Sequence, residues 1–272
     1  MLAIYRRRPQ RRASSVRAKN KDFSLAAAGT SRQGRRHSKN EDAFAVDQEH
    51  RIVVIADGMG ATRGARFCSW YAVDHLLAEL RDIPVDEHLD KQVVIAAIQN
   101  AFLSVNRQIV ALGNHNPHLF GMGTTAVVGM VRNDLLYIAS LGDSRAYLLR
   151  GGCLWQYTVD HTMAQALVAS GVISMSAARR HHWRHQLWKH LGRADLAQGP
   201  DVSVIRLEAG DRALFVTDGV TKVFDRHALA ELAAITDTPA QIARAITTAA
   251  AAAGSTDDIT CIAMHFAQQQ PA

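Results

Sequence analysis

A chain of 272 residues that is 48% hydrophobic and 21% charged has the composition of an ordinary globular protein, which excludes a fibrous or wholly disordered chain. The formal net charge of +6 is concentrated at one end, because residues 1–21 carry eight Lys and Arg and no acid. The remaining 23 basic and 25 acidic residues nearly cancel, which excludes a strongly basic body.

The N-terminal segment, residues 1–22, has no hydrophobic periodicity and is predicted to be a disordered basic tail. Such a tail can touch nucleic acid or an anionic membrane surface without specificity. The rest of the chain has no groove-recognition motif and only short, charge-interrupted apolar runs, so we expect no specific nucleic-acid partner and no membrane span. Three widely spaced cysteines are expected to be reduced core residues of a cytoplasmic protein: Cys68, Cys153 and Cys261.

Ten short apolar or alternating runs follow the tail, and each has the length of a strand between turn residues. In chain order they are "FSLAAAGT", "AFAVDQ", "RIVVIAD", "TTAVVGMVR", "LLYIASLG", "AYLLR", "LWQYTV", "VSVIRLEAG", "ALFVTDG" and "ITCIAMHF". The second and third are predicted to form a hairpin through "DQEHR". The fourth and fifth are predicted to form another, with its turn at Asn133-Asp134.

Four longer stretches have helical spacing instead. Residues 64–80 and 93–112 each place apolar side chains on one face. Two C-terminal helices are predicted around 226–235 and 239–253, the second ending at Gly254.

The order of these elements predicts the fold class. Because strands outnumber helices and mostly follow one another directly, we expect an α+β fold with antiparallel sheets and helices packed outside. A single domain is predicted over residues 23–267, with an irregular surface segment at 161–200 and a short tail at 268–272.

Carboxylates follow or precede several of the predicted strands, beside glycine. These sites are Glu41-Asp42, Asp57-Gly58, Asp143, Asp218-Gly219 and Asp257-Asp258. If the carboxylates converge they repel one another, and Mg²⁺ or Mn²⁺ relieves that repulsion, whereas the Cys/His spacing of a zinc site is missing. A β-rich protein also needs Asp-Gly turns, so convergence and simple turns both remain open at this point.

Longer motifs carry a resemblance to a known family. In chain order they are "GRRHSKNEDAF", "VIADGMG", "GMGTTAVV", "LGDSRAYLLRGGCLWQYTVDHT", "LEAGDRALFVTDGVT" and "STDDITCIAMHF". Over residues 23–267 the chain resembles PPM-type, protein phosphatase 2C-like, serine/threonine phosphatases of the bacterial kind. The resemblance implies a central antiparallel β-sandwich flanked by helices on both sides, in a metal-dependent enzyme that dephosphorylates proteins.

The resemblance also implies two ions of Mn²⁺ or Mg²⁺ and the residues that hold them. Asp57 bridges the two metals, and Gly58 lends its carbonyl. Glu41 belongs to the second metal, and Asp42 supports the waters of that metal.

The remaining implied ligands come from the C-terminal half. Asp218 and Asp257 belong to the first metal, and Asp143 pairs with Asp218 at a third, weaker site. A binuclear site makes hydroxide from a bridging water and offsets charge on the phosphoryl oxygens, so no Ser or Cys nucleophile is required.

The main departure from the family concerns phosphate binding. The family usually has Arg five residues before the Asp of "NED", and here that position holds His37. An Arg fork binds phosphate bidentately, whereas a histidine offers one donor at a time. If the segment is a strand, Arg36 points away and Arg35 is the better stand-in. The expected catalytic residues are therefore His37, Asp42 and Arg35, with reduced phosphate affinity and intact metal chemistry.

Other departures lie near the same motifs. "GMGATRGAR" lacks the usual acid and leaves Arg63 and Arg66 near the rim, as solvated side chains or as a replacement phosphate clamp. Asp258 stands where the family has Asn, and Lys222 stands where it has an acid. His161 is interpreted as a structural histidine near a helix N-cap, with a general-acid role as the alternative.

The segment "ARRHHWRHQLWKH" falls where the family has its variable flap. One interpretation is a helix whose Trp and Leu pack inward while its basic residues stay solvated. Another is a docking surface for an acidic phosphoprotein, made by Arg179, Arg180, Arg184, Lys189, Trp183 and Trp188. A transition-metal site from His181, His182 and His185 lacks regular ligand spacing.

The leading expectation is a monomeric, cytoplasmic, Mn²⁺/Mg²⁺-dependent phosphatase that opposes a bacterial Ser/Thr kinase. Its partner is a phosphorylated protein, either such a kinase or a kinase target. One alternative is a catalytically weakened phosphoprotein-binding module, because of His37. The other is a nucleic-acid binder directed by the basic tail.

Overall fold

The computed structural model describes residues 23–60, 64–84, 90–235 and 238–268. The predicted basic tail at 1–22 and the residue Arg63 lie outside this part of the chain. The predicted C-terminal tail is mostly outside it as well, although the last strand extends to Gln268, one residue past the predicted boundary.

All ten predicted runs form strands, and the strands make two antiparallel sheets. The first sheet has the order β1-β11-β10-β7-β8, with β1 Phe23–Arg32, β11 Ile259–Gln268, β10 Arg212–Val216, β7 Arg145–Arg150 and β8 Cys153–Gln156. The second has the order β2-β3-β5-β6-β9, with β2 Asp42–Asp47, β3 Ile52–Met59, β5 Ala126–Arg132, β6 Leu135–Leu141 and β9 Asp201–Arg206. The short β4, Gly123–Thr124, pairs with the end of β3.

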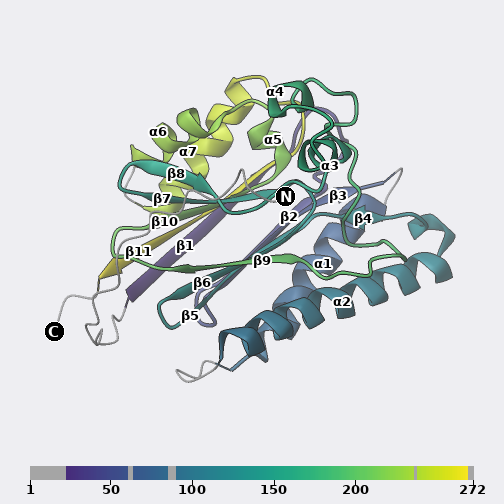
Figure 1. Cartoon of the computed structure of the whole chain (residues 1–272), viewed down its shortest axis with the longest axis horizontal. Coiled ribbons are helices and arrows are strands. Elements are labelled where there is room, and N and C mark those ends of the chain that lie inside the picture. The colour runs from purple at the N-terminus through teal and green to yellow at the C-terminus, as the bar shows by residue number, and fades with distance from the viewer. Residues whose placement is uncertain (1–22, 61–63, 85–89, 236–237, 269–272) are drawn as a thin grey trace.

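Helices cover the outer face of each sheet (Figure 1). The second sheet is covered by α1, Gly64–Arg81, and α2, Lys91–His115, which pack through Leu76, Ile98 and Phe102. The first sheet is covered by the one-turn α5, Asp218–Thr221, and by α6, Arg226–Ala234, and α7, Pro239–Ala252. The four predicted helices are thus confirmed, and the layers follow the expected order of helix, sheet, sheet, helix.

The two sheets pack face to face around a core of apolar side chains. Ile55, Val127, Ile138, Phe215 and Phe266 are buried there. Both predicted hairpins are present, and Asn133 adopts φ 56° in the two-residue turn that joins Arg132 to Leu135.

Helix α2 is the longest helix of the described chain. Among the described residues, α2 alone is long and apolar enough to cross a membrane. Its buried side chains include Val94, Ile98, Val105 and Ile109, which belong to the core beneath the second sheet. Its apolar face is therefore that of a core helix in this fold.

The segment 161–200 is the least regular part of the described chain, as predicted. It contains only two short helices, α3 Met163–Ala169 and α4 Met175–Ala178. Isolated bridges at Thr162–Leu187 and Thr124–Leu191 attach it to itself and to β4. A further 3-10 turn, η1 Pro117–Leu119, follows α2.

One cysteine differs from the prediction. Cys68 and Cys261 are buried and free, as expected, whereas Cys153 is free and exposed. It lies at the start of β8, the outermost strand of the first sheet, after the tight turn at Gly151-Gly152, where no layer covers it.

Candidate metal and active site

Antiparallel topology brings the strand-end carboxylates to one end of the sandwich. Asp42 begins β2 and Asp57 lies near the end of β3, and the two residues pair directly across the strands. Asp218 follows β10 and Asp257 precedes β11, which are also antiparallel neighbours. The loop between β6 and β7 adds Asp143.

These groups converge, which decides between the two interpretations left open by the sequence. Asp42 pairs with Asp57, ligand atoms of Asp143 and Asp218 lie within 4.8 Å of each other, and Lys222 contacts both Asp218 and Asp257. The pKa of Asp57 is raised well above its ordinary value, first by burial and then by the negative charges of Asp42, Asp218, Asp143 and Asp257. Glu41 and Asp258 adjoin this group. The pKa of Glu41 is raised, first by burial and also by the negative charges of Asp258 and Asp257, although His37 acts in the opposite direction. We call these seven residues the acidic cluster.

Asp42 is held from below by two hydroxyls. Its Oδ2 accepts hydrogen bonds from Thr260 Oγ1 at 2.6 Å and Thr217 Oγ1 at 2.9 Å, while its buried Oδ1 has no partner in the described structure. Burial raises the pKa of Asp42 to about 8 in spite of these hydrogen bonds. No protein group in the described structure therefore offsets the cost of burying a negative charge on Asp42 Oδ1.

Asp143 and Asp218 form a second pair. Burial, and then the charge of Asp218, raises the pKa of Asp143 to about 8. Asp218 Oδ1 is buried and has no hydrogen-bond partner among the described residues. The segment 161–200 contributes a histidine here, because ligand atoms of Asp143, Asp218 and His185 all lie within 4.8 Å of one another. Sequence reasoning missed His185 at this place.

Lys222 lies between two carboxylates of the cluster. Its Nζ is 2.5 Å from Asp218 Oδ2 and 2.6 Å from Asp257 Oδ2. Although burial lowers the pKa of Lys222, the two carboxylates more than compensate and raise it. Burial by itself would raise the pKa of Asp257. The hydrogen bond that Asp257 accepts from Lys222 outweighs this effect, and the pKa of Asp257 is lowered.

The loop 33–41 is organised by backbone hydrogen bonds to the start of β11. Asp258 accepts from the backbone N–H of Gly34 at 2.8 Å and of Glu41 at 2.7 Å. A Cβ on Gly34 would lie 2.2 Å from the backbone of Asp257, so only glycine fits there. Asp258 is thus a loop anchor, a role that its family position did not indicate.

His37 lies among carboxylates on this loop. Its Nδ1 is 3.5 Å from Asp258 Oδ2, 3.6 Å from Glu41 Oε2 and 3.8 Å from Asp257 Oδ1. Its carbonyl accepts a hydrogen bond from Gln33 Nε2. The His37 imidazole therefore lies next to three carboxylates of the acidic cluster.

The prediction that Arg36 points away from the site is wrong. Residues 33–41 do not form a strand, because the backbone N–H groups of Arg35 and Arg36 both donate to the Thr256 carbonyl. The alternation of side chains along a strand therefore does not apply to this loop. Arg36 Nη1 lies 3.4 Å from Asp257 Oδ2. The exposed Arg35 side chain forms no hydrogen bond or ion pair with the described residues.

Gly58 permits a close backbone approach. A Cβ at this position would lie 2.2 Å from the carbonyl oxygen of Ala65 in α1 and 2.8 Å from that of Glu41. The Glu41 carbonyl also accepts from the backbone N–H of Gly58 and from Ser69 Oγ. The glycine beside Asp57 therefore lets α1 and the Glu41 backbone meet at the site.

The donor set fits hard divalent cations. Carboxylate oxygens dominate, two buried oxygens on Asp42 and Asp218 lack partners, and three aspartates have a pKa raised by burial and mutual repulsion. Mg²⁺ and Mn²⁺ prefer such oxygen ligands, and their charge offsets the repulsion. The residues present are thus suited to these ions.

His161 occupies a structural position, in agreement with the favoured interpretation. It is buried, its Nδ1 accepts from the backbone N–H of Gly142 at 3.0 Å, and its Nε2 faces Asp201 Oδ2 at 3.3 Å. The next residue, Thr162, is the N-cap of α3. These contacts join the segment 161–200 to β6 and β9.

The basic segment at its centre is not the predicted helix. After α4 it consists of turns, and Trp183 and Trp188 are partly exposed instead of packed inward. The described residues show no ligand cluster of His181 with His182 and His185; the first two rings stack at 4.4 Å.

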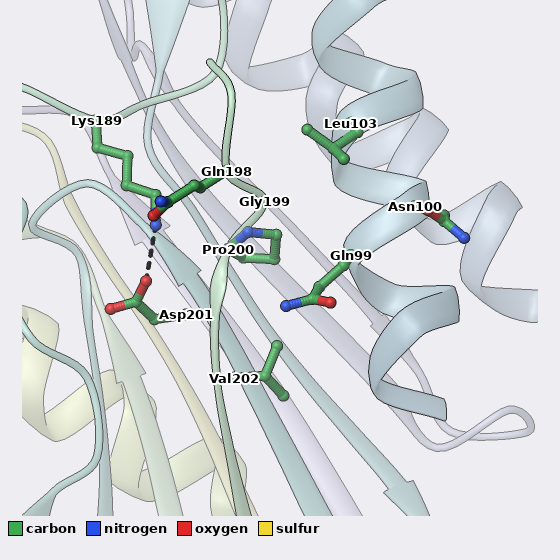
Figure 2. Close-up of a pocket in the computed structure, with 9 residues that line it drawn as sticks. All are labelled: Gln99, Asn100, Leu103, Lys189, Gln198, Gly199, Pro200, Asp201 and Val202. Atoms are coloured by element: carbon green, nitrogen blue, oxygen red, sulfur yellow. Dashed lines mark hydrogen bonds and ion pairs between the residues drawn. The ribbon is translucent and has the colours of Figure 1, made fainter. Parts of the chain in front are cut away.

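Lys189 is not part of the exposed basic surface, because it is buried against Asp201 at 2.7 Å. Figure 2 shows this pair beside a cavity between α2 and the start of β9. That cavity is lined by α2 residues such as Gln99 and Leu103 and shares no residue with the acidic cluster. Arg66, predicted near the rim, is exposed on the first turn of α1.

Comparisons with known proteins agree with this geometry. The protein phosphatase 2C family model matches residues 28–253. The serine/threonine phosphatase stp of Listeria monocytogenes serotype 4b is 30% identical over 233 residues, which are 85% of this chain and 91% of that protein. The serine/threonine protein phosphatase PstP of Mycobacterium tuberculosis is 29% identical over 252 residues, which are 91% of this chain and 47% of that protein.

Solved structures show the same fold. The crystal structure of the Mycobacterium tuberculosis phosphatase PstP/Ppp matches with a TM-score of 0.80 and 30% identity, covering 90% of this chain and 99% of that one. The catalytic domain of PstP in complex with two manganese ions matches with a TM-score of 0.78 and 28% identity, covering 91% and 100%. With its carboxylates gathered at the end of a four-layer sandwich, the chain belongs to the protein phosphatase 2C family of metal-dependent phosphatases.

Proposed function

We propose that this enzyme removes phosphate from phosphoserine and phosphothreonine of a protein substrate and thereby opposes a Ser/Thr kinase. The observation that carries the proposal is the convergence of buried carboxylates with two unpartnered oxygens at the end of the sandwich. The relatives named above support the substrate class, since they are described as serine/threonine phosphatases.

Within this proposal, Asp57 would help to hold both divalent ions, Asp218 and Asp257 would hold the first, and Glu41 would hold the second. The carbonyl of Gly58 would add a further oxygen beside Asp57. When bound, the ions supply positive charge for the phosphoryl oxygens and lower the pKa of a water to make it nucleophilic.

The protein groups then position the reactants. The Oδ2 of Asp42 is fixed by Thr217 and Thr260, and its buried Oδ1, which has no protein partner among the described residues, would accept a hydrogen bond from water. Asp143 and Asp218, with His185 nearby, would hold a third ion. This arrangement needs no protein nucleophile.

Phosphate recognition falls to the loop 33–41. His37 stands at the position of the usual arginine but is surrounded by carboxylates, so it offers the substrate less than a free guanidinium would. Arg36 is the guanidinium on this loop that reaches the cluster, and 64% of its side chain is exposed. We propose that Arg36 provides the main positive charge for an incoming phosphate, with His37 as a secondary donor.

A second candidate function rests on the same feature. If His37 binds phosphate too weakly for efficient turnover, the protein acts as a phosphoprotein-binding signalling module. In both cases the partner is a phosphorylated protein, and we propose a monomer located in the cytoplasm, in keeping with its three free cysteines.

Mn²⁺-dependent hydrolysis of a small aryl phosphate and of a phosphothreonine peptide tests the proposal. We expect wild-type activity that requires the metal and is lost in Asp57→Asn and Asp218→Asn. Tight phosphopeptide binding without turnover would favour the binding module, and absence of both would overturn the proposed function.

A further inference from the structure

Lys222 occupies an unusual place for a basic residue in a metal-dependent phosphatase. Its ammonium lies between Asp218 Oδ2 at 2.5 Å and Asp257 Oδ2 at 2.6 Å, the two carboxylates that would hold the first metal. The family usually carries an acid at this position, so the local charge differs in sign from the expected one.

We propose that Lys222 is a resident counter-cation that competes with the divalent ion for Asp218 and Asp257. The inference rests on the proposed metal ligands and concerns how tightly one of the two ions binds. Binding at this pair requires the ammonium to leave both oxygens, because a lysine and a dication cannot share the same carboxylate oxygens without strong repulsion.

The local helix explains how the lysine reaches both partners. Asp218 begins α5 and Lys222 caps its C-terminus, so the two side chains are four residues apart on one helical face. Asp257 comes from the turn before β11, which α5 contacts. The ammonium therefore closes the gap between two elements that a metal ion would otherwise join.

The lysine can also withdraw. Its side chain is 27% exposed, and a flexible four-carbon stem allows the ammonium to move into solvent without disturbing the core. Displacement of Lys222 is thus compatible with the fold. Because the ammonium must leave both carboxylates before the metal binds, the free energy of this displacement weakens the affinity for the metal.

The other side of the cluster has no competitor of this strength, because the basic group nearest to Glu41 is the His37 imidazole, whose Nδ1 lies 3.6 Å from Glu41 Oε2. Among the described residues, no Lys, Arg or His forms an ion pair with Asp42 or Asp57. Two ions bound to this protein would consequently differ in affinity, and the weaker one is the ion at Asp218 and Asp257.

Calorimetric titration of the metal-free protein with Mn²⁺ tests this inference. We expect Lys222→Met to strengthen one binding event on the order of tenfold to a hundredfold, the factor associated with removing a charged hydrogen-bond partner, and to leave the other event unchanged. Lys222→Arg keeps the charge and should retain the weak event. The metal-free Lys222→Met protein should also unfold at a lower temperature, because two carboxylates lose their cation.

Lys189→Met is the matched control. Lys189 forms an ion pair of similar length with Asp201, at 2.7 Å and away from the acidic cluster, so this change should lower thermal stability without changing Mn²⁺ affinity. If Lys222→Met binds Mn²⁺ no more tightly than the wild type, Lys222 is not a competitor. If no variant and no wild-type protein binds Mn²⁺ at all, the proposed metal site fails, which is a separate result.

A second measurement uses the unmodified protein and does not depend on a variant that folds. In lysine labelled with ¹³C at Cε, the Lys222 resonance should shift during a Mg²⁺ titration as the ammonium leaves the two carboxylates. A Lys222 resonance that stays constant while Mg²⁺ binds at both sites would contradict the proposal.

Discussion

Two pairs of aspartates in the same acidic cluster are balanced in opposite ways. The inner pair, Asp42 and Asp57, is buried without a basic partner in the described structure, and the pKa of both is raised, chiefly by burial. The outer pair, Asp218 and Asp257, has Lys222 between its carboxylates, and the pKa of Asp257 is lowered despite burial. Identical side chains in one cluster thus differ because one pair has its own cation and the other must obtain one from solution.

The largest expected effect comes from removing the central carboxylate of the inner pair. Asp57→Asn should lower metal-dependent phosphatase activity by at least about a thousandfold, because Asp57 would contact both ions. Phosphatase assays at saturating Mn²⁺ measure this. Asp47→Asn removes an acid of β2 that pairs with Arg81 outside the cluster, and it should keep its activity well below its unfolding temperature. Comparable losses in both variants would show that the effect is structural.

The inner pair also predicts how stability depends on pH. The folded-state pKa of Asp42, about 8, lies above its unfolded value, so its stabilising contribution is present at low pH and is lost as the pH rises from about 4 toward 8. The metal-free protein should therefore lose stability, of order a few kcal/mol, between pH 6 and pH 8. Thermal unfolding at several pH values measures the loss.

A divalent cation and a neutral side chain are the controls for this prediction. Added Mn²⁺ should reduce the pH dependence, since it stabilises the ionised carboxylates. Asp42→Asn should reduce it as well, because asparagine does not titrate. A metal-free wild type that becomes more stable from pH 6 to pH 8 would contradict the account of the inner pair.

A smaller effect is expected at the hydroxyls beneath Asp42. Thr260→Val removes a buried donor at 2.6 Å and should destabilise the protein by about 1–3 kcal/mol while raising the pKa of Asp42 further. Chemical denaturation measures the first quantity. Thr247→Val, which removes a buried hydroxyl bonded to the Ala243 carbonyl in α7, is a control that should leave metal binding unchanged.

The smallest effect is expected at the phosphate side of the outer pair. His37→Arg should lower the KM for an aryl phosphate by about tenfold at most, since the guanidinium offers a bidentate contact. A variant in which kcat changes while KM stays the same, or in which neither changes, would count against a phosphate role for His37. Arg36→Gln should raise the KM, and Arg35→Gln should not.

Part of this site followed from local sequence. Each predicted carboxylate lies near one end of an apolar strand, and two of these strand ends are readable because the apolar run is followed by Asp-Gly, at Asp57 and Asp218. The orientation of Arg35 and Arg36 was not readable in this way, because the loop 33–41 is shaped by the carbonyl of Thr256 and the carboxylate of Asp258, more than 200 residues later. The position of His185 depends likewise on the path of the irregular segment 161–200.

The sequence by itself determined the strands, the main helices, the antiparallel architecture and the family, because these depend on periodicity, turn residues and ordered motifs. The tertiary structure alone decided which charges meet. Lys222 could be recognised in the sequence as a departure from the family, but only the packing of α5 against β11 places its ammonium between Asp218 and Asp257. Charge balance in a buried site depends on distances between residues that are far apart in the chain, and the amino-acid sequence alone does not specify those distances.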